Sequence, residues 1–383
     1  MKKEITSLRA KRGNPIKILI LALVVIGICG FIFRGWIAAP SARNDNTETK
    51  PTVKIGVILP LTGNSADVGV MAKDAILLAL NEKNQDELNY KYVFIIEDDQ
   101  FKSSITAPTA NKFIFTDKVS AIMTYYAPAG FIVNPLAEQN KIIHLGNTWE
   151  EDVSRGKFNI IQYTTMDEMI DKSIQHIKQK NISDVAIITE VRGTSEKYAR
   201  KAEKALKEQG FRVAFDSFNR GERDFRILIR KLQQDGYNFF IVNTIRPEFD
   251  IILKQLHEAG VSNDYILATG GDTLPDMSLY EGVVFAGAST GTEDFINKYQ
   301  STYGRAPGYG SVISYDLANL LIKAYEDNYI PNKLPDNEKV LEYIYNQDVY
   351  GCGAIKCIID ENGYIKNPAI LRQVKDGKYI NLD

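Results

Sequence analysis

The stretch VKIGVILPLTGNSADVGVMAKDAILLALN, residues 53–81, predicts a strand, a turn and an amphipathic helix in direct succession. Its first residues, Val53–Ile58, are mostly apolar, which is typical of a strand covered on both faces of a parallel sheet. Residues 66–83 repeat apolar side chains at helical spacing, which predicts one buried helix face. A strand followed by a helix is the repeating unit of parallel α/β folds, so this stretch sets the fold class.

The same alternation continues along the chain. Further strands are predicted at 92–96, 121–124, 141–144, 185–189, 212–215, 239–242 and 265–268. Helices are predicted at 103–116, 129–139, 167–180, 195–209, 223–235 and 247–259. Two such runs predict an α/β fold with two doubly wound, parallel-sheet lobes.

The C-terminal part follows a different order, with three helices before two strands. We predict helices at 291–303, 311–326 and 337–346, then strands at 354–359 and 364–373. The turn Asp360–Gly363 between these strands favours a hairpin. We assign residues 52–163 and 289–346 to the first lobe, and residues 164–288 and 347–383 to the second.

The N-terminal part differs from the rest in charge and hydropathy. Residues 1–50 hold 9 Lys/Arg and 3 Asp/Glu, a net +6, so the chain's net charge of −2 leaves −8 on the remainder. Residues 1–17 form a basic tail, expected in the cytoplasm, before the uninterrupted apolar run Ile18–Phe33. This run of roughly 24 Å is slightly short for a bilayer core, so 18–39 is either a signal anchor or a cleaved signal peptide. Residues 40–51 are a polar linker.

Several functional classes are disfavoured. A folded part with net negative charge and no basic block is a poor nucleic-acid binder. The sequence lacks the phosphate-binding, nucleophile-elbow and zinc-helix motifs, and its histidines His144, His176 and His257 are far apart. We expect neither an enzyme nor a bound cofactor or metal. Cys352 and Cys357 are either a disulfide of an exported protein or two thiols, and the sequence leaves both open.

The loops that leave the strand ends are the expected place for a ligand, as in other open α/β sheets. The first such loop, residues 60–69, offers the hydroxyl of Thr62, backbone N–H groups and a helix start, which suit an anion. An ordinary turn with a helix cap explains the same residues equally well.

Several segments, in this order, resemble the substrate-binding proteins of branched-chain amino-acid ABC transporters, the leucine/isoleucine/valine-binding group. They are Ile55–Asn81, Glu97–Asp99, Arg220–Leu228, Pro247–Glu248, Gly270–Asp272, Tyr299–Asp316 and Ile358–Asp376. The resemblance covers nearly all of residues 52–383 and rests on order and spacing rather than on one motif. It implies a type I periplasmic binding protein fold, with three segments crossing between the lobes and a ligand in the cleft.

The resemblance also implies residue roles. Thr148 matches the hydroxyl that holds a ligand carboxylate, and Asp272 matches the acid that holds the ammonium. The family usually has a serine in the loop that here reads Tyr125–Gly130, where Ala127 offers only its backbone N–H.

Other positions depart from the family pattern. His144 stands where serine is common, and Thr194 stands where an aromatic residue often covers the ligand. Tyr126 and Trp149 would supply replacement walls, although ordinary packing is at least as good an explanation of each. The candidate ligand-binding residues are therefore Thr62, Tyr126, Ala127, His144, Thr148, Trp149, Thr194 and Asp272.

These observations predict a substrate-binding protein that delivers an amino acid, or a related zwitterionic or amide ligand, to the membrane permease of an ABC transporter. The alternative is a membrane-anchored ligand-sensing receptor of the same fold without a transport role. Either protein would lie on the periplasmic or extracellular face of the cytoplasmic membrane.

Overall fold

The computed structural model describes residues 50–63, 65–83, 87–269, 277–308, 310–349 and 357–382. The basic tail, the apolar segment and most of the linker predicted at residues 1–51 lie outside these ranges. Among the residues that are described, no helix has the length and apolar character needed to cross a membrane.

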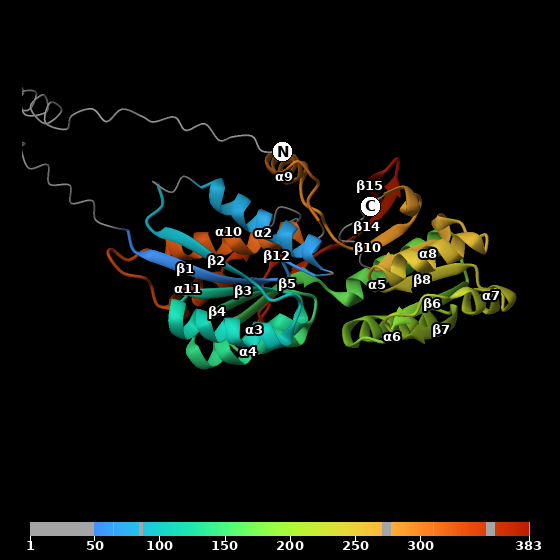
Figure 1. The fold of residues 1–383 in the computed structure, drawn as a ribbon, viewed down its shortest axis with the longest axis horizontal. Coiled ribbons are helices and arrows are strands. Elements are labelled where there is room, and N and C mark those ends of the chain that lie inside the picture. The colour runs from blue at the N-terminus through green and yellow to red at the C-terminus, as the bar shows by residue number, and fades with distance from the viewer. Residues whose placement is uncertain are drawn as a thin grey trace, which may run out of the picture. The chain divides into compact units, whose positions relative to one another are not determined.

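The first lobe is built on a six-stranded, all-parallel sheet with the order β13-β5-β4-β3-β1-β2 (Figure 1). Its strands are β1 (Thr52–Leu59), β2 (Lys91–Asp98), β3 (Ala121–Tyr125), β4 (Ile143–Asn147), β5 (Asn159–Thr164) and β13 (Tyr364–Asn367). Its helices are α2 (Ala66–Asn81), α3 (Ser103–Asn111), α4 (Ala127–Asn140), α9 (Glu293–Tyr303), α10 (Ser311–Asp327) and α11 (Asn337–Tyr345).

Helices cover both faces of this sheet, as the continuous apolar strands predict. One core cluster joins the sheet to α2, α9, α10 and α11, and another joins it to α3, α4 and the π-helical turn Lys112–Asp117 that continues α3. In the second cluster, the π-helical turn approaches the sheet closely at Gly56 of β1. A Cβ at this position would lie 2.3 Å from the ring of Phe113. Glycine at this position therefore lets that ring lie directly on the sheet.

The second lobe is built on a seven-stranded sheet with the order β15-β14-β10-β9-β8-β6-β7. Its strands are β6 (Asp184–Glu190), β7 (Arg212–Phe218), β8 (Phe239–Asn243), β9 (Ile266–Thr269), β10 (Val284–Ala288), β14 (Ala369–Lys375) and β15 (Lys378–Asn381). Strands β6 to β10 are parallel, whereas β14 and β15 run antiparallel at one edge. Helices α5 (Met166–Gln179) and α6 (Gly193–Glu208) pack on one face, and α7 (Arg226–Gln234) and α8 (Glu248–Glu258) pack on the other.

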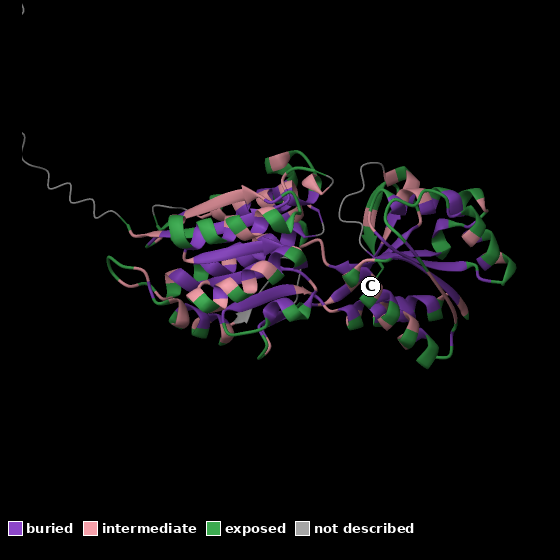
Figure 2. Cartoon of the chain, turned by 60° about the horizontal axis from the view of Figure 1, so that its bottom comes forward, coloured by how far each residue is buried: buried purple, intermediate pink, exposed green. Residues whose placement is uncertain are grey.

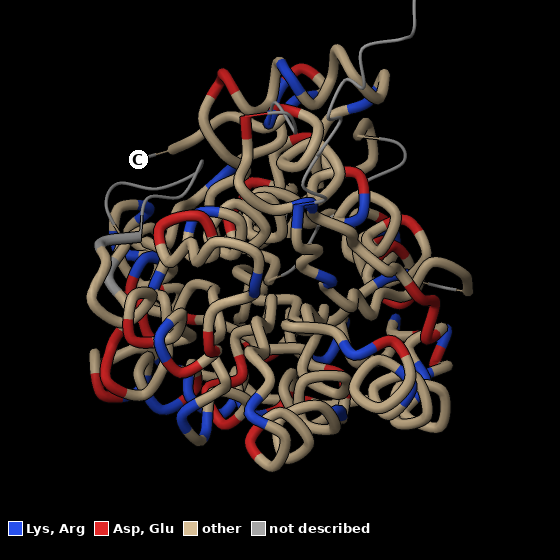
Figure 3. The backbone as a smooth tube through the Cα atoms, turned by 90° about the vertical axis from the view of Figure 1, so that its left-hand side faces the viewer, with Lys and Arg blue, Asp and Glu red and all other residues tan. Residues whose placement is uncertain are grey.

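Short elements complete the described chain. They are the paired strands β11 (Asp348–Val349) and β12 (Cys357–Ile358) and the 3-10 turns η2 (Glu151–Ser154), η3 (Asn263–Tyr265) and η4 (Met277–Tyr280). Figure 2 shows the inner strands of both sheets buried, whereas the edge strand β2 is mostly of intermediate burial, and many helices have an exposed face. Figure 3 shows that basic and acidic residues are interspersed over the outer parts of the chain.

The chain passes between the two sheets three times, after β5, after β10 and after β13. The assignment of all of residues 347–383 to the second lobe is wrong, because β13 pairs with β5 in the first sheet. The strand predicted at 364–373 is in fact two strands separated by Pro368. Proline has no N–H to donate to a ladder, so it suits the point where the chain leaves one sheet for the other.

Candidate ligand-binding site

A cavity of about 290 Å³ lies among the loops at the carboxyl ends of strands in both sheets. The first lobe contributes five aromatic rings, from Phe101, Tyr125, Tyr126, Trp149 and Tyr163. The second lobe contributes mainly polar side chains, from Arg192, Thr194, Ser195, Asn243, Thr244 and Thr269. Carboxyl ends of parallel strands are where α/β proteins bind small molecules, which makes this cavity the candidate ligand site.

The structure brings most of the predicted residues together at this cavity. Its lining includes five of the eight candidates, namely Tyr126, Ala127, Thr148, Trp149 and Thr194. Asp272 lies outside the described residues. Thr62 and His144 are not part of the lining.

Thr148 follows directly after β4 and is buried at the cavity wall. Its Oγ1 accepts a hydrogen bond of 3.2 Å from the backbone N–H of Glu150, which leaves the hydroxyl proton able to donate to a ligand oxygen. Ala127 begins α4, where the first N–H groups of a helix have no partner within it. Together they offer the first lobe's hydrogen-bond donors to a carboxylate.

Tyr126 holds an unusual backbone conformation next to the cavity. Its φ of 68° and ψ of 152° lie in a region populated almost only by glycine, at a cost of about 1–3 kcal/mol. Phe101, also in the lining, has a φ of 60°. The ring of Tyr126 meets Phe101 edge-to-face at 4.9 Å and Tyr125 at 4.4 Å. The surrounding structure thus holds two aromatic residues at this wall against their backbone preference.

Trp149 and Glu150 connect the two lobes beside the cavity. Trp149 follows β4 in the first lobe, but its ring stacks on Tyr198 of α6 at 6.3 Å and meets Tyr163 edge-to-face at 5.8 Å. The buried carboxylate of Glu150 accepts a hydrogen bond from Lys197 of α6, and this contact raises the pKa of Lys197. These two neighbouring residues therefore hold the first lobe to α6.

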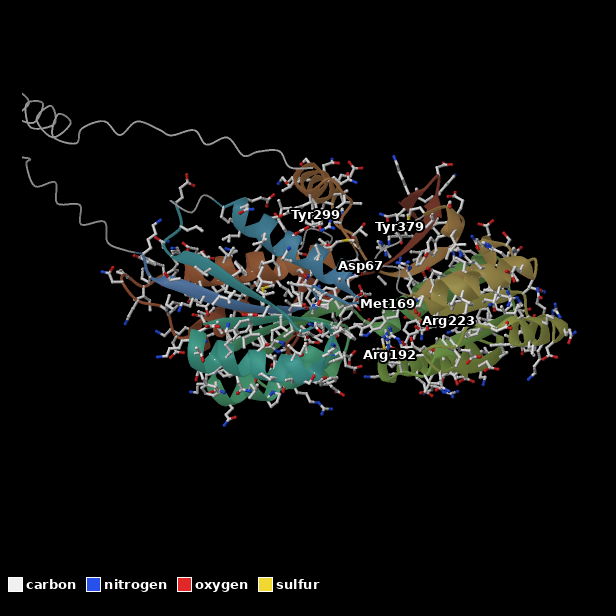
Figure 4. All side chains as sticks on the ribbon, viewed as in Figure 1. Asp67, Met169, Arg192, Arg223, Tyr299 and Tyr379 are labelled. Atoms are coloured by element: carbon white, nitrogen blue, oxygen red, sulfur yellow. The ribbon has the colours of Figure 1, made fainter. Side chains whose placement is uncertain are left out.

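The second lobe's part of the wall is the start of α6. Arg192 is the residue before this helix, and the first turn, Gly193–Ser195, also lines the cavity. Arg192 lies at the end of α6 nearest the first lobe (Figure 4). Within the described part of the chain, its guanidinium has no ion pair or side-chain hydrogen bond. Sequence reasoning missed Arg192, although its position two residues after β6 was a usable signal.

Beneath this wall lies a buried hydrogen-bond network around Asn243, at the end of β8. Its Nδ2 donates to Thr189 Oγ1 at 3.0 Å and to the carbonyl of Ser195 at 2.6 Å. Its Oδ1 accepts from the hydroxyl of Thr269. The neighbouring Thr244 donates to Glu190 Oε2 at 3.0 Å. This network joins β6, β8 and β9 to the start of α6, so the polar wall is held in one arrangement.

The prediction that Thr62 lines the ligand site is wrong for this cavity. Its hydroxyl donates to Asp98 Oδ2 at 2.5 Å, at the end of β2. Burial alone would raise the pKa of Asp98, but this bond and three backbone N–H groups lower it below its ordinary value. The hydroxyl of Thr62 therefore belongs to an ordinary β-to-α turn, which is the alternative to an anion-binding loop that the sequence left open.

The prediction that His144 belongs to the ligand site is also wrong for this cavity. Its ring is fully buried in the first sheet, with Nε2 at 2.9 Å from Thr124 Oγ1 and Nδ1 at 2.7 Å from Asn159 Oδ1. Burial lowers its pKa to about 4, so the ring is neutral at pH 7. Both nitrogens have partners inside the sheet, and neither is available to a ligand.

The predicted cysteine pair lies partly outside the described residues, because Cys352 is not among them. Cys357 is buried in β12, with Sγ at 3.3 Å from Asn367 Oδ1. The disulfide between Cys352 and Cys357 stays a prediction.

Two α/β lobes, three connections and a cavity at the carboxyl ends of both sheets define a two-lobed solute-binding protein. A family model described as periplasmic binding protein matches residues 52–378, and the chain belongs to that family. This confirms the resemblance to the branched-chain amino-acid binding proteins and, with the two sheets, the type I fold.

Individual relatives agree with this assignment. The leucine-, isoleucine-, valine-, threonine-, and alanine-binding protein of Pseudomonas aeruginosa is 25% identical over 59% of this chain and 65% of its own length. The match thus spans slightly less than two thirds of that relative.

Solved structures extend the likeness over more of the chain. The leucine binding protein LivK of Thermotoga maritima superposes with a TM-score of 0.75 at 23% identity, covering 86% of this chain and 98% of that one. A solute binding protein from Rhodopseudomonas palustris, solved with 3,4-dihydroxy benzoic acid, gives 0.75 at 22% identity, covering 86% and 95%. At these identities the two structures show the fold.

Proposed function

We propose that this chain is the substrate-binding protein of an ABC transporter and holds an amino acid, or a related small zwitterionic or amide ligand, between its lobes. The observation that carries the proposal is the cavity shared by strand ends of both sheets. Its volume of about 290 Å³ suits a small molecule. The family of the chain, whose relatives bind amino acids, supports the same function.

Ligand binding would be coupled to closure of the lobes. A molecule that contacts Thr148 in the first lobe and Thr194 in the second is held best when both lobes meet it, so it favours the closed form. The three connections between the sheets are the natural hinge, since few backbone torsions separate the lobes there. The closed form would then dock on the membrane permease.

For the cell, we propose that residues 18–39 export the chain and hold or release it at the outer face of the cytoplasmic membrane. An uncleaved segment with a cytoplasmic tail would favour the alternative of a ligand-sensing receptor. An anchored receptor needs a segment in the membrane and a part of the chain in the cytoplasm. Mass spectrometry of the mature N-terminus tests the anchor. A chain that begins after residue 39 would rule it out.

Isothermal titration with a panel of amino acids and their amides tests the proposed function. We expect binding by the wild type, and about tenfold weaker binding by Thr148→Val, which keeps the shape but removes the hydroxyl. Thr302→Val, on the exposed face of α9, is the matched control and should bind as the wild type does. Equal affinity of Thr148→Val and the wild type for every ligand would contradict the role of Thr148.

A further inference from the structure

The two lobes give the cavity walls of different chemistry. All five aromatic rings of the lining belong to the first lobe, whose other polar side chains there, besides three tyrosine hydroxyls and the indole N–H, are Asn147 and Thr148. The second lobe offers hydroxyls, an amide and a guanidinium, with Ile245 as its one large apolar side chain there among the described residues. A ligand that satisfies both walls has an apolar body on one side and a polar group on the other.

The charge of the polar wall selects the sign of that group. Among the described residues of the lining, Arg192 is the one charged side chain. The free N–H groups in the first turn of α6 add to its positive potential, because a helix start carries a partial positive charge. An anion would therefore be attracted to this part of the wall.

The geometry of the cation favours a carboxylate among anions. A guanidinium is a planar fork whose N–H groups match two carboxylate oxygens, so one Arg192 neutralises one carboxylate with two hydrogen bonds. A phosphate, with its higher charge, calls for more cations than the single Arg192 found among the described residues of the lining.

The apolar wall favours a flat ring. Phe101 and Tyr126 meet edge-to-face, as do Trp149 and Tyr163, so ring faces and edges border the cavity. A pair of aromatic rings in a stacked or edge-to-face arrangement is stabilised beyond the burial of its area. Phe101 and Tyr126 have positive φ angles, of 60° and 68°, so their rings are held in this wall at a cost in backbone strain.

We propose that the ligand is an aromatic carboxylate, whose ring lies against the aromatic wall of the first lobe and whose carboxylate pairs with Arg192 at the start of α6. The proposal rests on the proposed solute-binding function, but it replaces the zwitterionic or amide ligand proposed there with an anionic aromatic one. An α-amino group is not required, because the carboxylate is held from the second lobe. Arg192 is then the residue that determines specificity for acids.

Calorimetric titration of the intact protein tests this. The probes are benzoate, 4-hydroxybenzoate and phenylacetate, their neutral amides, cyclohexanecarboxylate, and leucine. We expect the aromatic acids to bind more tightly than their amides and than the non-aromatic acid. Arg192→Gln should weaken the aromatic acids by roughly 10- to 100-fold and leave the amides unchanged. Arg192→Lys should recover part of the loss.

Arg230→Gln, on the exposed face of α7, is the control for loss of one positive charge in the second lobe and should bind as the wild type does. Circular dichroism and thermal unfolding establish that each variant is folded. If leucine binds equally to wild type and Arg192→Gln while no aromatic acid binds, the aromatic-acid proposal is overturned and the solute-binding function stands. If no probe of either kind binds the folded protein, both are overturned.

Discussion

In the first lobe the cavity is bordered by aromatic rings on strand-end loops, whereas in the second lobe it is bordered by the start of α6 above a buried polar network. Both lobes use the same architecture, a mainly parallel sheet with helices on both faces. The comparison shows that the fold fixes where the ligand lies, while a few loop residues in each lobe fix what it is.

The two lobes also differ in which one reaches across. Trp149 and Glu150 leave the first lobe and contact α6 of the second, through a stacked ring and an ion pair. The same loop carries Thr148, which lines the cavity. Three consecutive residues therefore contribute both to the cavity lining and to the contact between the lobes, so a ligand bound at Thr148 would be coupled to that contact.

The largest effect is expected for the polar network of the second lobe. Asn243→Leu would leave Thr189, the carbonyl of Ser195 and Thr269 without their buried partner. We expect the free energy of unfolding to fall by about 4 kcal/mol, because each unsatisfied buried group costs about 1–3 kcal/mol. Urea denaturation measures it. Asn111→Leu, at an exposed helical site, is the control, and an equal small loss in both variants would show that the network does not hold the wall.

The interior of the first lobe should respond to acid through His144. Its pKa is lowered from 6.5 to about 4 by burial, so the native state resists a proton that the unfolded chain accepts. The contribution of the neutral ring to the free energy of unfolding is fully present above pH 6.5. It is lost as the pH falls towards 4, by about 3 kcal/mol in total.

His144→Gln keeps a polar side chain and removes this titration. The difference in unfolding free energy between wild type and variant should therefore shrink on acidification from pH 7 to pH 4, as measured by denaturant titrations. His176, whose pKa is also lowered by burial, is unchanged in both proteins and cancels in the difference. A difference that does not vary with pH would show that His144 is not buried as a neutral ring.

A smaller effect is expected where the lobes contact each other. Lys197→Met breaks the ion pair with Glu150, which joins the lobes, and should weaken ligand binding about fivefold, about 1 kcal/mol after solvent screening. Lys201→Met, one turn further along α6, breaks an exposed pair with Asp167 inside the second lobe and is the control. Fluorescence titration of Trp149 follows both. Identical ligand affinities of the two variants would show that the Lys197–Glu150 ion pair does not contribute to closure of the lobes around the ligand.

The smallest effect is expected at Thr62. Because its hydroxyl serves Asp98 in a turn outside the cavity lining, Thr62→Val should change ligand affinity by less than about twofold. Calorimetry beside Thr148→Val gives the comparison within one lobe. If Thr62→Val lost as much ligand affinity as Thr148→Val, Thr62 would belong to the ligand site after all.

Much of the fold could be predicted from the sequence because most strands are continuous apolar runs. The strand β5 could not be, since Asn159, Gln162 and Thr164 are polar although they are fully buried. Their side chains bond within the lobe, as Gln162 does to Asn367 at 3.1 Å, and a single sequence does not show such pairing. The split at Pro368 was also missed, because the residues on both sides of this proline have the composition of a strand.

The candidate site was predictable where a residue stands at a position of the family pattern, as for Thr148 and Thr194, which both line the cavity. It was not predictable where several loops must converge. Phe101 and Arg192 are separated by many residues in the chain and meet only at the cavity. His144 shows the opposite failure, since it stands where serine is common in the family but its ring is hydrogen-bonded inside the sheet.

The most direct measurement is a crystal structure of the protein purified with the ligand that it retains from its native host. We predict a small molecule in the cavity, with its carboxylate about 3 Å from the guanidinium of Arg192 and its ring against Tyr126 and Trp149. A ligand that lies in the cavity without any contact to Arg192 would contradict this assignment.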